Sequence, residues 1–266
     1  MCANKGQVMQ YQPGFAIKAD FKNMVFEYGH GTFGPEVERR MLDSIRGSLM
    51  DPSCTGPEIV YSIAMDVGKT KDYSELVRRN LLFGTVLYAN GQLGEEPIRS
   101  QGHIHAVSQS CGESTPEVYE IWNGKAVIYM QESAKDRCGR CYAVEGLPGD
   151  IIVVPPGWAH ATISADPNQP LVFGAWCVRD YGFDYKEVRS HRGLAYFPIV
   201  VEGELSWRNN PSYSAEPLVI KRPRIYTELS LRPFVPIYSQ YEENHECFKF
   251  VINPSTVKDI WENFIP

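Results

Sequence analysis

Three histidines and one glutamate in the middle of the sequence have the residue types and spacing of a metal site. His103 and His105 are two positions apart, and Glu117 and His160 follow further along the chain. Alternate side chains of a β-strand lie on one face, so a strand over 103–105 would turn both imidazoles the same way. Imidazole nitrogens and a carboxylate oxygen suit Fe(II), Mn(II), Ni(II) or Zn(II). We therefore expect these four side chains to bind one divalent metal.

The residues around the four candidate ligands have the patterns of short strands. The run 117–122 ends at Asn123-Gly124, a dipeptide suited to a tight hairpin turn, and the apolar run 150–155 leads into a Pro-Gly turn before His160. Strands recur with Gly, Asn and Pro between them, and they are expected at 81–89, 98–106, 117–122, 125–132, 140–145, 150–155, 159–164 and 171–178. Such spacing without helical patterns indicates an all-β sandwich or barrel.

The flanking sequence is expected to add a few elements around this barrel. On the N-terminal side the patterns predict strands at 15–21, 24–28 and 59–67, a helix over 35–49 and a charged helix or loop over 72–79. On the C-terminal side they predict strands at 195–201 and 246–252, and a short helix over 253–261 with Asn253 as its cap. We expect three parts: an N-terminal arm of strands and a helix (1–80), the barrel with the metal site (81–190) and a C-terminal extension (191–266).

Composition limits the kind of protein. A formal net charge of -6 gives no general basic face for DNA or RNA, and 43% hydrophobic residues suffice for a large core. The first seven residues lack the apolar core of a signal peptide, and no run is long enough to span a membrane, so a cytoplasmic protein is expected. Seven cysteines at scattered positions fit reduced thiols, and Cys138 and Cys141 are interpreted as thiols flanking a glycine turn rather than as half of a zinc ribbon. The basic cluster 221–224 is interpreted as a solvated surface.

Two segments together resemble the signatures of the cupin superfamily. The residues from Gly149 through Pro155-Pro156-Gly157 to His160 are similar to the second signature, although Ser164 stands where an asparagine is usual. The pair of histidines followed by Glu117 and Gly124 is similar to the first signature, with a longer gap before the glutamate than most cupins have. The resemblance implies a double-stranded β-helix, or jelly roll.

Within the cupins, the sequence is most similar to the archaeal-type, metal-dependent phosphoglucose isomerases. The similar runs are residues 84–88, 100–106, 117–119, 154–160 and 180–185, and the resemblance extends from about residue 14 to about residue 205. It implies a homodimer that interconverts glucose 6-phosphate and fructose 6-phosphate. The charge and the apolar runs described above add the expectation of no nucleic-acid and no membrane partner.

The resemblance also implies roles for particular residues. It places the metal on His103, His105, Glu117 and His160, and it places sugar-phosphate contacts at Thr85, Ser100, Gly102 and Tyr119, with Tyr185 near the sugar. Two positions depart from the family pattern, since Cys177 stands at a family tyrosine position and Phe183 at a family histidine position.

The chemistry of such a site would be aldose–ketose isomerisation. A Lewis acid next to O1 and O2 stabilises the charge that develops as hydrogen moves between C1 and C2. We expect Fe(II) first, with Mn(II), Ni(II) or Zn(II) as alternatives, and Glu117 and Tyr185 as the catalytic residues. A ligated carboxylate is a poorer base, so Glu113, Tyr119 and Tyr185 stay open as alternatives for the base.

Three other functions use the same fold. The departures at Cys177 and Phe183 leave open an isomerase for another acidic, 6-substituted hexose. The same ligand set could bind Fe(II) for a dioxygenase, which oxygen consumption would reveal. A sugar-binding cupin without catalysis is the remaining alternative, because fold alone does not fix function.

Overall fold

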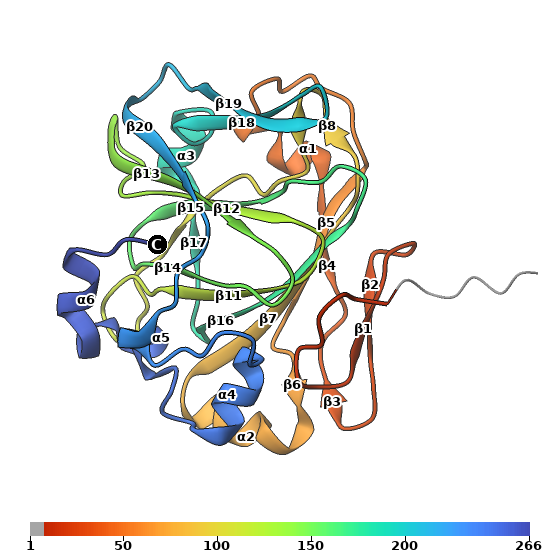
Figure 1. The fold of residues 1–266 in the computed structure, drawn as a ribbon, viewed down its shortest axis with the longest axis vertical. Coiled ribbons are helices and arrows are strands. Elements are labelled where there is room, and N and C mark those ends of the chain that lie inside the picture. The colour runs from red at the N-terminus through yellow and green to blue at the C-terminus, as the bar shows by residue number, and fades with distance from the viewer. Residues whose placement is uncertain (1–7) are drawn as a thin grey trace, which may run out of the picture.

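The computed structural model describes residues 8–266, which form two facing β-sheets with short helices at their edges (Figure 1). The strands are β1 (Ile17–Asp20), β2 (Val25–Tyr28), β3 (Thr32–Phe33), β4 (Glu38–Met41), β5 (Ile59–Met65), β6 (Gly68–Lys69), β7 (Leu81–Tyr88), β8 (Gln92–Leu93), β9 (Glu96–Pro97), β10 (Ile104–His105), β11 (Glu117–Asn123), β12 (Ala126–Gln131), β13 (Arg137–Gly146), β14 (Ile151–Val154), β15 (Ala159–Ser164), β16 (Leu171–Val178), β17 (Phe183–Asp184), β18 (Tyr196–Val201), β19 (Glu204–Asn209) and β20 (Ser214–Lys221). The helices are α1 (Leu42–Ile45), α2 (Tyr73–Arg78), α3 (Lys186–Ser190), α4 (Ile237–Glu243), α5 (Lys249–Ile252) and α6 (Lys258–Glu262), with 3-10 turns η1 (Arg46–Ser48), η2 (Thr70–Asp72), η3 (Thr227–Leu229) and η4 (Pro254–Val257).

The order of the strands is that of a jelly roll. The first sheet has the order β14-β11-β16-β7-β5-β4, and the second has the order β15-β12-β13-β20. From β11 to β16 the chain moves repeatedly between the two sheets, and these strands pair with one another antiparallel. β20 joins the edge of the second sheet parallel to β13. Beside β15 the remaining position is filled by isolated bridges from Arg99 and His103. The expected all-β, double-stranded β-helix is therefore confirmed.

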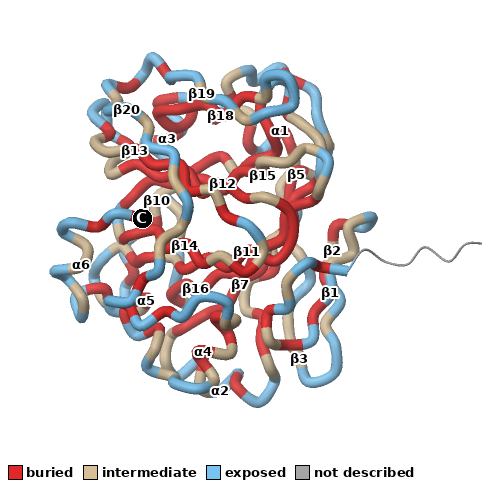
Figure 2. Tube along the Cα trace, in the orientation of Figure 1, coloured by how far each residue is buried: buried red, intermediate tan, exposed pale blue. Residues whose placement is uncertain are grey.

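The strands β14, β11, β16 and β7 of the first sheet are buried on both faces. Its inner face contributes Tyr119 and Phe173 to the hydrophobic cluster between the sheets. Its outer face contributes Phe83, Trp122 and Trp176 to a second cluster. Burial on both faces explains why β14 and β16 have apolar runs with little alternation (Figure 2).

The C-terminal segment covers the outer face of the first sheet. Tyr238 of α4 stacks on Trp176 with ring centroids 5.4 Å apart, and Phe248 lies 5.3 Å from the same ring. At Gly174 a Cβ atom would overlap the ring of Trp122, so only glycine allows this close packing. Figure 1 shows α4 and α5 lying against this side of the barrel.

Glu120 ties the C-terminal segment to the centre of this sheet. Its carboxylate accepts hydrogen bonds from the backbone N–H of Ile237 and from Nε1 of Trp122, both at 2.8 Å. Burial raises the pKa of Glu120 to about 8, although both hydrogen bonds act to lower it.

Several predicted elements were wrong. The helix over 35–49 begins only at Leu42, because residues 38–41 form β4 and pair with β5. The strand over 246–252 is replaced by α5, whose Phe250 and Val251 are buried in the C-terminal cluster. The terminal helix starts as η4, and the Asn253 side chain makes no capping hydrogen bond.

Other expectations have mixed outcomes. Cys138 and Cys141 flank Gly139 on β13 as free, buried thiols with sulfur atoms 3.5 Å apart. Across residues 8–266 no helix is long and apolar enough to cross a membrane. The expectation about a signal peptide concerns residues 1–7, which lie outside the described part. The division of the chain at residues 80 and 190 stays a prediction.

Candidate metal centre

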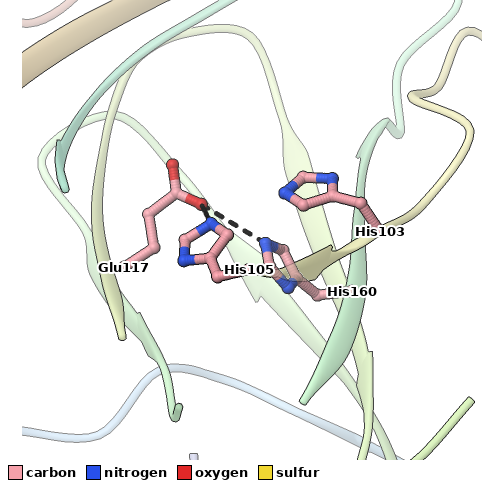
Figure 3. Close-up of side chains that lie close together, drawn as sticks. All are labelled: His103, His105, Glu117 and His160. Carbon is pink, nitrogen blue, oxygen red and sulfur yellow. Dashed lines mark hydrogen bonds and ion pairs between the residues drawn. The ribbon is translucent and has the colours of Figure 1, made fainter. Parts of the chain in front are cut away.

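Four predicted ligands meet between the two sheets (Figure 3). One ligand atom from each of His103, His105, Glu117 and His160 lies within 4.8 Å of all the others. Oε2 of Glu117 lies 3.2 Å from Nε2 of His105 and 3.3 Å from Nε2 of His160. Residues from β10, β11 and β15 thus converge on one point at the inner side of the barrel.

Local backbone pairing explains how these side chains come to face one another. The backbones of His103 and His160 exchange two hydrogen bonds, at 3.0 and 2.9 Å, so their side chains lie on one face. Gly102 precedes this pair with a φ of +87°, and a Cβ there would lie 2.8 Å from Cδ1 of Leu194. The rings of His103 and His105 stack with centroids 5.3 Å apart, as the i, i+2 spacing predicts.

Hydrogen bonds on the far side of two imidazoles orient their rings. Nδ1 of His105 lies 2.8 Å from the carbonyl oxygen of Thr115, and Nδ1 of His160 lies 3.1 Å from that of Trp158. A carbonyl only accepts, so Nδ1 of each ring donates its proton there, and Nε2 is the nitrogen that faces Glu117. Each Nε2 lies 3.2 or 3.3 Å from Oε2 of Glu117, a separation that needs a proton or a metal cation between the two atoms, because two lone pairs would repel each other.

The third imidazole and the carboxylate also fit a bound cation. Nε2 of His103 is buried and has no hydrogen-bond partner within residues 8–266. Burial, with the adjacent His160 and His105, holds the pKa of His103 well below its usual range, so this ring is neutral. Burial acts to raise the pKa of Glu117, but the two imidazoles outweigh it and hold the pKa well below its usual range. Three imidazole nitrogens and one ionised carboxylate could hold one divalent metal.

Three of the other predicted residues lie near this centre. The Tyr119 hydroxyl donates to Oε2 of Glu117 at 2.7 Å. The ring of Tyr185 lies 5.9 Å from that of His103, between centroids. Ser100 pairs with Thr162 of β15 through backbone and hydroxyl hydrogen bonds of 3.0 Å, two residues beyond His160.

The structure does not bring Thr85 to the centre. Thr85 lies opposite Gly174 in the sheet, and Gly174 faces Trp122 and Phe83 on the outer side. Its hydroxyl donates to the carbonyl oxygen of Phe173 at 3.1 Å. Cross-strand partners share a face, so Thr85 points away from the metal centre.

Glu113, one alternative for the base, is also engaged elsewhere. Both of its carboxylate oxygens lie 2.7 Å from the hydroxyl of Ser255 in the C-terminal segment. This contact occupies the carboxylate at an exposed position.

Both departures from the family pattern lie next to the ligands. Phe183 pairs with His105 across β10 and β17, and its ring lies 4.4 Å from that of His103. Cys177 faces inward on β16; burial, and next the charge of Glu117, raise the pKa of its thiol well above the usual range.

The sequence interpretation missed two hydroxyls beside the candidate metal centre, those of Tyr88 and Thr162. Tyr88 is fully buried, and its phenol lies beside the hydroxyls of Ser100 and Thr162. Period-2 alternation from His160 would have pointed to Thr162. Tyr88 had no such signal, because β7 is buried on both faces.

The fold and the centre together define a jelly-roll protein with a three-histidine, one-carboxylate cluster of the kind that binds divalent metals. The family model described as glucose-6-phosphate isomerase (GPI) matches residues 51–216, and the chain belongs to this family.

Individual relatives agree with the family match. Glucose-6-phosphate isomerase of Thermococcus litoralis is 26% identical over 211 residues, which is 77% of this chain and 99% of the relative. The enzyme of the same name from Thermococcus kodakarensis is 29% identical over 210 residues, again 77% of this chain and 99% of the relative. Among solved structures, an oxalate oxidase aligns with 47% of this chain and 54% of its own at a TM-score of 0.35 and 13% identity.

Proposed function

We propose that this chain interconverts glucose 6-phosphate and fructose 6-phosphate at a divalent metal held by His103, His105, Glu117 and His160. The observation that supports this most directly is the convergence of these four ligand atoms within 4.8 Å, in a chain of the glucose-6-phosphate isomerase family. We expect Fe(II) first, with Mn(II), Ni(II) or Zn(II) as alternatives.

When bound, the divalent cation would supply Lewis acidity toward O1 and O2 of the sugar as charge develops there. The chain itself would position the substrate and move the proton. Oε2 of Glu117 is occupied by two imidazoles and by Tyr119, whereas Oε1 has no hydrogen-bond partner within residues 8–266. Glu117 can therefore use one oxygen as a ligand and the other to accept a proton from C1 or C2.

Tyr185 would act as a hydrogen-bond donor in this scheme. Burial raises the pKa of its hydroxyl, so the phenol is protonated at neutral pH. Its ring lies beside His103 at the edge of the centre, where it would face the sugar. Ser100 and Tyr119 complete the set of hydroxyls that we assign to substrate binding; Gly102 sets the backbone turn before the ligands.

A coupled assay tests the proposal. Metal-free protein is reconstituted separately with Fe(II), Mn(II) and Zn(II), and conversion of fructose 6-phosphate to glucose 6-phosphate is followed. We expect turnover that depends on the added metal and is lost on chelation. Absence of turnover with every metal, at full metal occupancy, would contradict the assignment of the substrate.

A second candidate substrate is another hexose with an acidic group at C6. The observation that favours it is the apolar ring of Phe183 lying 4.4 Å from His103, at a position where a histidine was expected. A panel of 6-phosphorylated and 6-carboxylated hexoses, assayed with the same metals, separates the two candidates.

The expected homodimer stays a prediction. Sedimentation velocity of the full chain measures the oligomeric state directly. A dimer is expected, and a monomer would contradict the prediction.

A further inference from the structure

Two cysteines of β13 form a thiol pair that the proposed function does not use. Sγ of Cys138 lies 3.5 Å from Sγ of Cys141, and both side chains are buried. A disulfide bond is about 2 Å long, so the two sulfur atoms need to approach by only about 1.5 Å to form one. Both residues belong to the hydrophobic cluster on the outer face of the second sheet, whereas the candidate metal ligands lie on the inner side of the barrel.

A bulge at Gly139 places both thiols on one face of β13. Alternate residues of a strand share a face, so regular alternation would place Cys138 on the inner face with Tyr142. Gly139 has a φ of +69°, and the register between β13 and β20 shifts on either side of it. The bulge reverses the alternation and brings Cys138 to the outer face with Cys141.

The strand that covers this pair is irregular at the same place. β20 is the edge strand of the second sheet, and the carbonyl oxygen of Ser214 at its start lies 3.9 Å from Sγ of Cys138. Opposite residues 139–141, β20 has one extra residue in the ladder, and Pro217 there has no N–H to donate. An irregular edge strand opens at a lower free-energy cost than an inner strand, and opening of β20 would expose both thiols to a small solute.

The two thiols differ in acidity, which assigns their order of reaction. Burial raises the pKa of Cys138, and the hydrogen bond with Cys141 opposes that rise. Burial raises the pKa of Cys141 to about 12. Both thiols are therefore protonated while β20 is closed, and Cys138 is the first to form a thiolate when the strand opens.

We propose that Cys138 and Cys141 are a redox-sensitive modification site, which hydrogen peroxide converts to a disulfide and a dithiol reductant restores. The thiolate of Cys138 attacks one peroxide oxygen: an S–O bond forms, the O–O bond breaks, and the departing hydroxide takes up a proton to become water. Sγ of Cys141 then attacks the sulfur of this sulfenic acid. An S–S bond forms, the S–O bond breaks, and a second water leaves with the proton of Cys141. The thiol pair loses two electrons, and the peroxide gains them.

The second sulfur decides what the first oxidation produces. A sulfenic acid without a nearby thiol persists or is oxidised further to the sulfinic acid. With Cys141 3.5 Å away, the disulfide forms first and protects Cys138 from irreversible oxidation. The four-residue segment from Cys138 to Cys141 therefore has the geometry of a reversible site.

Peroxide treatment of the full chain tests the proposal. The chain is loaded with Zn(II), which is not redox-active, and catalase ends the reaction. We expect the intact mass to fall by two hydrogen atoms and two of the seven cysteines to escape alkylation in denaturant. Trypsin cleaves after Arg137 and Arg140, so the new bond should keep fragment 138–140 attached to the fragment that starts at Cys141 until a dithiol reductant is added.

Cysteine variants provide the controls. Cys138→Ser and Cys141→Ser should each fail to lose two hydrogen atoms, because one partner of the bond is missing. Cys54→Ser removes a buried cysteine of a different cluster and should still form the linked fragments. Melting temperatures of all variants are measured, and the fragment map of the unmodified chain decides the question even if one variant fails to fold.

The opening of β20 is tested in the same experiment. Urea at a concentration well below the unfolding midpoint should raise the rate of disulfide formation, because it favours local opening. Seven alkylated cysteines after peroxide, both without urea and with it, would overturn the proposal. A gain of oxygen atoms on residues 138 or 141 in place of the linked fragments would also overturn it. Neither result bears on the isomerase, because the readout is the state of the thiols and not turnover.

Discussion

Replacing Glu120 by glutamine should remove most of a pH dependence of stability that the fold predicts. The carboxylate is buried on the outer face of β11, and its pKa is raised to about 8. In the unfolded chain a glutamate titrates near its ordinary value of 4.5. Below that pH the group is protonated in both states, and its full contribution to stability is present.

As pH rises from 4.5 toward 8, the unfolded chain loses this proton while the folded chain keeps it. The unfolded state is favoured over that window, and the free energy of unfolding falls by about 1.4 kcal/mol per pH unit. Over the whole window the loss is on the order of 5 kcal/mol, and it levels off above the folded pKa.

Urea unfolding at a series of pH values from 5 to 9 measures the effect in the unmodified chain and in Glu120→Gln. In the variant, the NH2 group of glutamine faces an N–H donor whose hydrogen bond an oxygen of Glu120 accepts, so the variant starts at lower stability at pH 5. Its curve should nevertheless be flatter by about 1.4 kcal/mol per pH unit up to pH 8. Glu204→Gln on an exposed strand serves as the control and should keep the original slope. Equal slopes for Glu120→Gln and the unmodified chain would refute the reasoning.

Three further outcomes follow from the site and the packing. His105→Ala should not bind stoichiometric metal, as measured by elemental analysis, because one imidazole ligand is missing. The control His245→Ala, outside the four-residue cluster, should retain full metal content. Full metal content in His105→Ala counts against the ligand assignment. Cys177→Tyr should raise kcat/KM for fructose 6-phosphate if this inward position contacts the sugar, and unchanged kinetic constants argue against that contact. Gly174→Ala should lower the free energy of unfolding by about 1–3 kcal/mol or more, because the added methyl group would overlap the ring of Trp122. A melting temperature equal to that of the unmodified chain would contradict this packing.

The strands that hold the ligands could be predicted because their signals are local. The run 117–122 ends at a turn dipeptide, and the observed β11 begins at Glu117 as expected. The 159–164 strand follows a Pro-Gly turn, and β15 has the predicted bounds. Residue types and period-2 alternation placed both ligands of these strands without knowledge of the rest of the fold.

The edge strand β4 of the first sheet could not be predicted in this way. Arg40 was placed in a helix, because Val37, Met41 and Ile45 have a helical spacing and β4 is only four residues long. What makes residues 38–41 a strand is pairing with β5, which lies about twenty residues further along the chain. Tertiary pairing overrides local periodicity for so short a segment.

The direction of Thr85 was hidden for a different physical reason. In β7 every residue but one is buried, so hydrophobicity does not reveal which alternate positions face inward. Only the register with Gly174 and its aromatic neighbours shows that Thr85 faces outward. The C-terminal segment produces this burial, and it lies beyond the residues that the family model matches.

The two faces of β11 connect that C-terminal segment to the proposed chemistry. On the inner face Glu117 and Tyr119 are hydrogen-bonded at the metal centre; on the outer face Glu120 accepts the first N–H of α4 and holds the ring of Trp122. Successive residues of one strand cannot shift independently. If the contacts of Glu120 on the outer face were displaced, the backbone that carries Glu117 and Tyr119 would move with them. Residues beyond 216 therefore contribute to fixing the carboxylate at the centre, even though none of them is a predicted ligand.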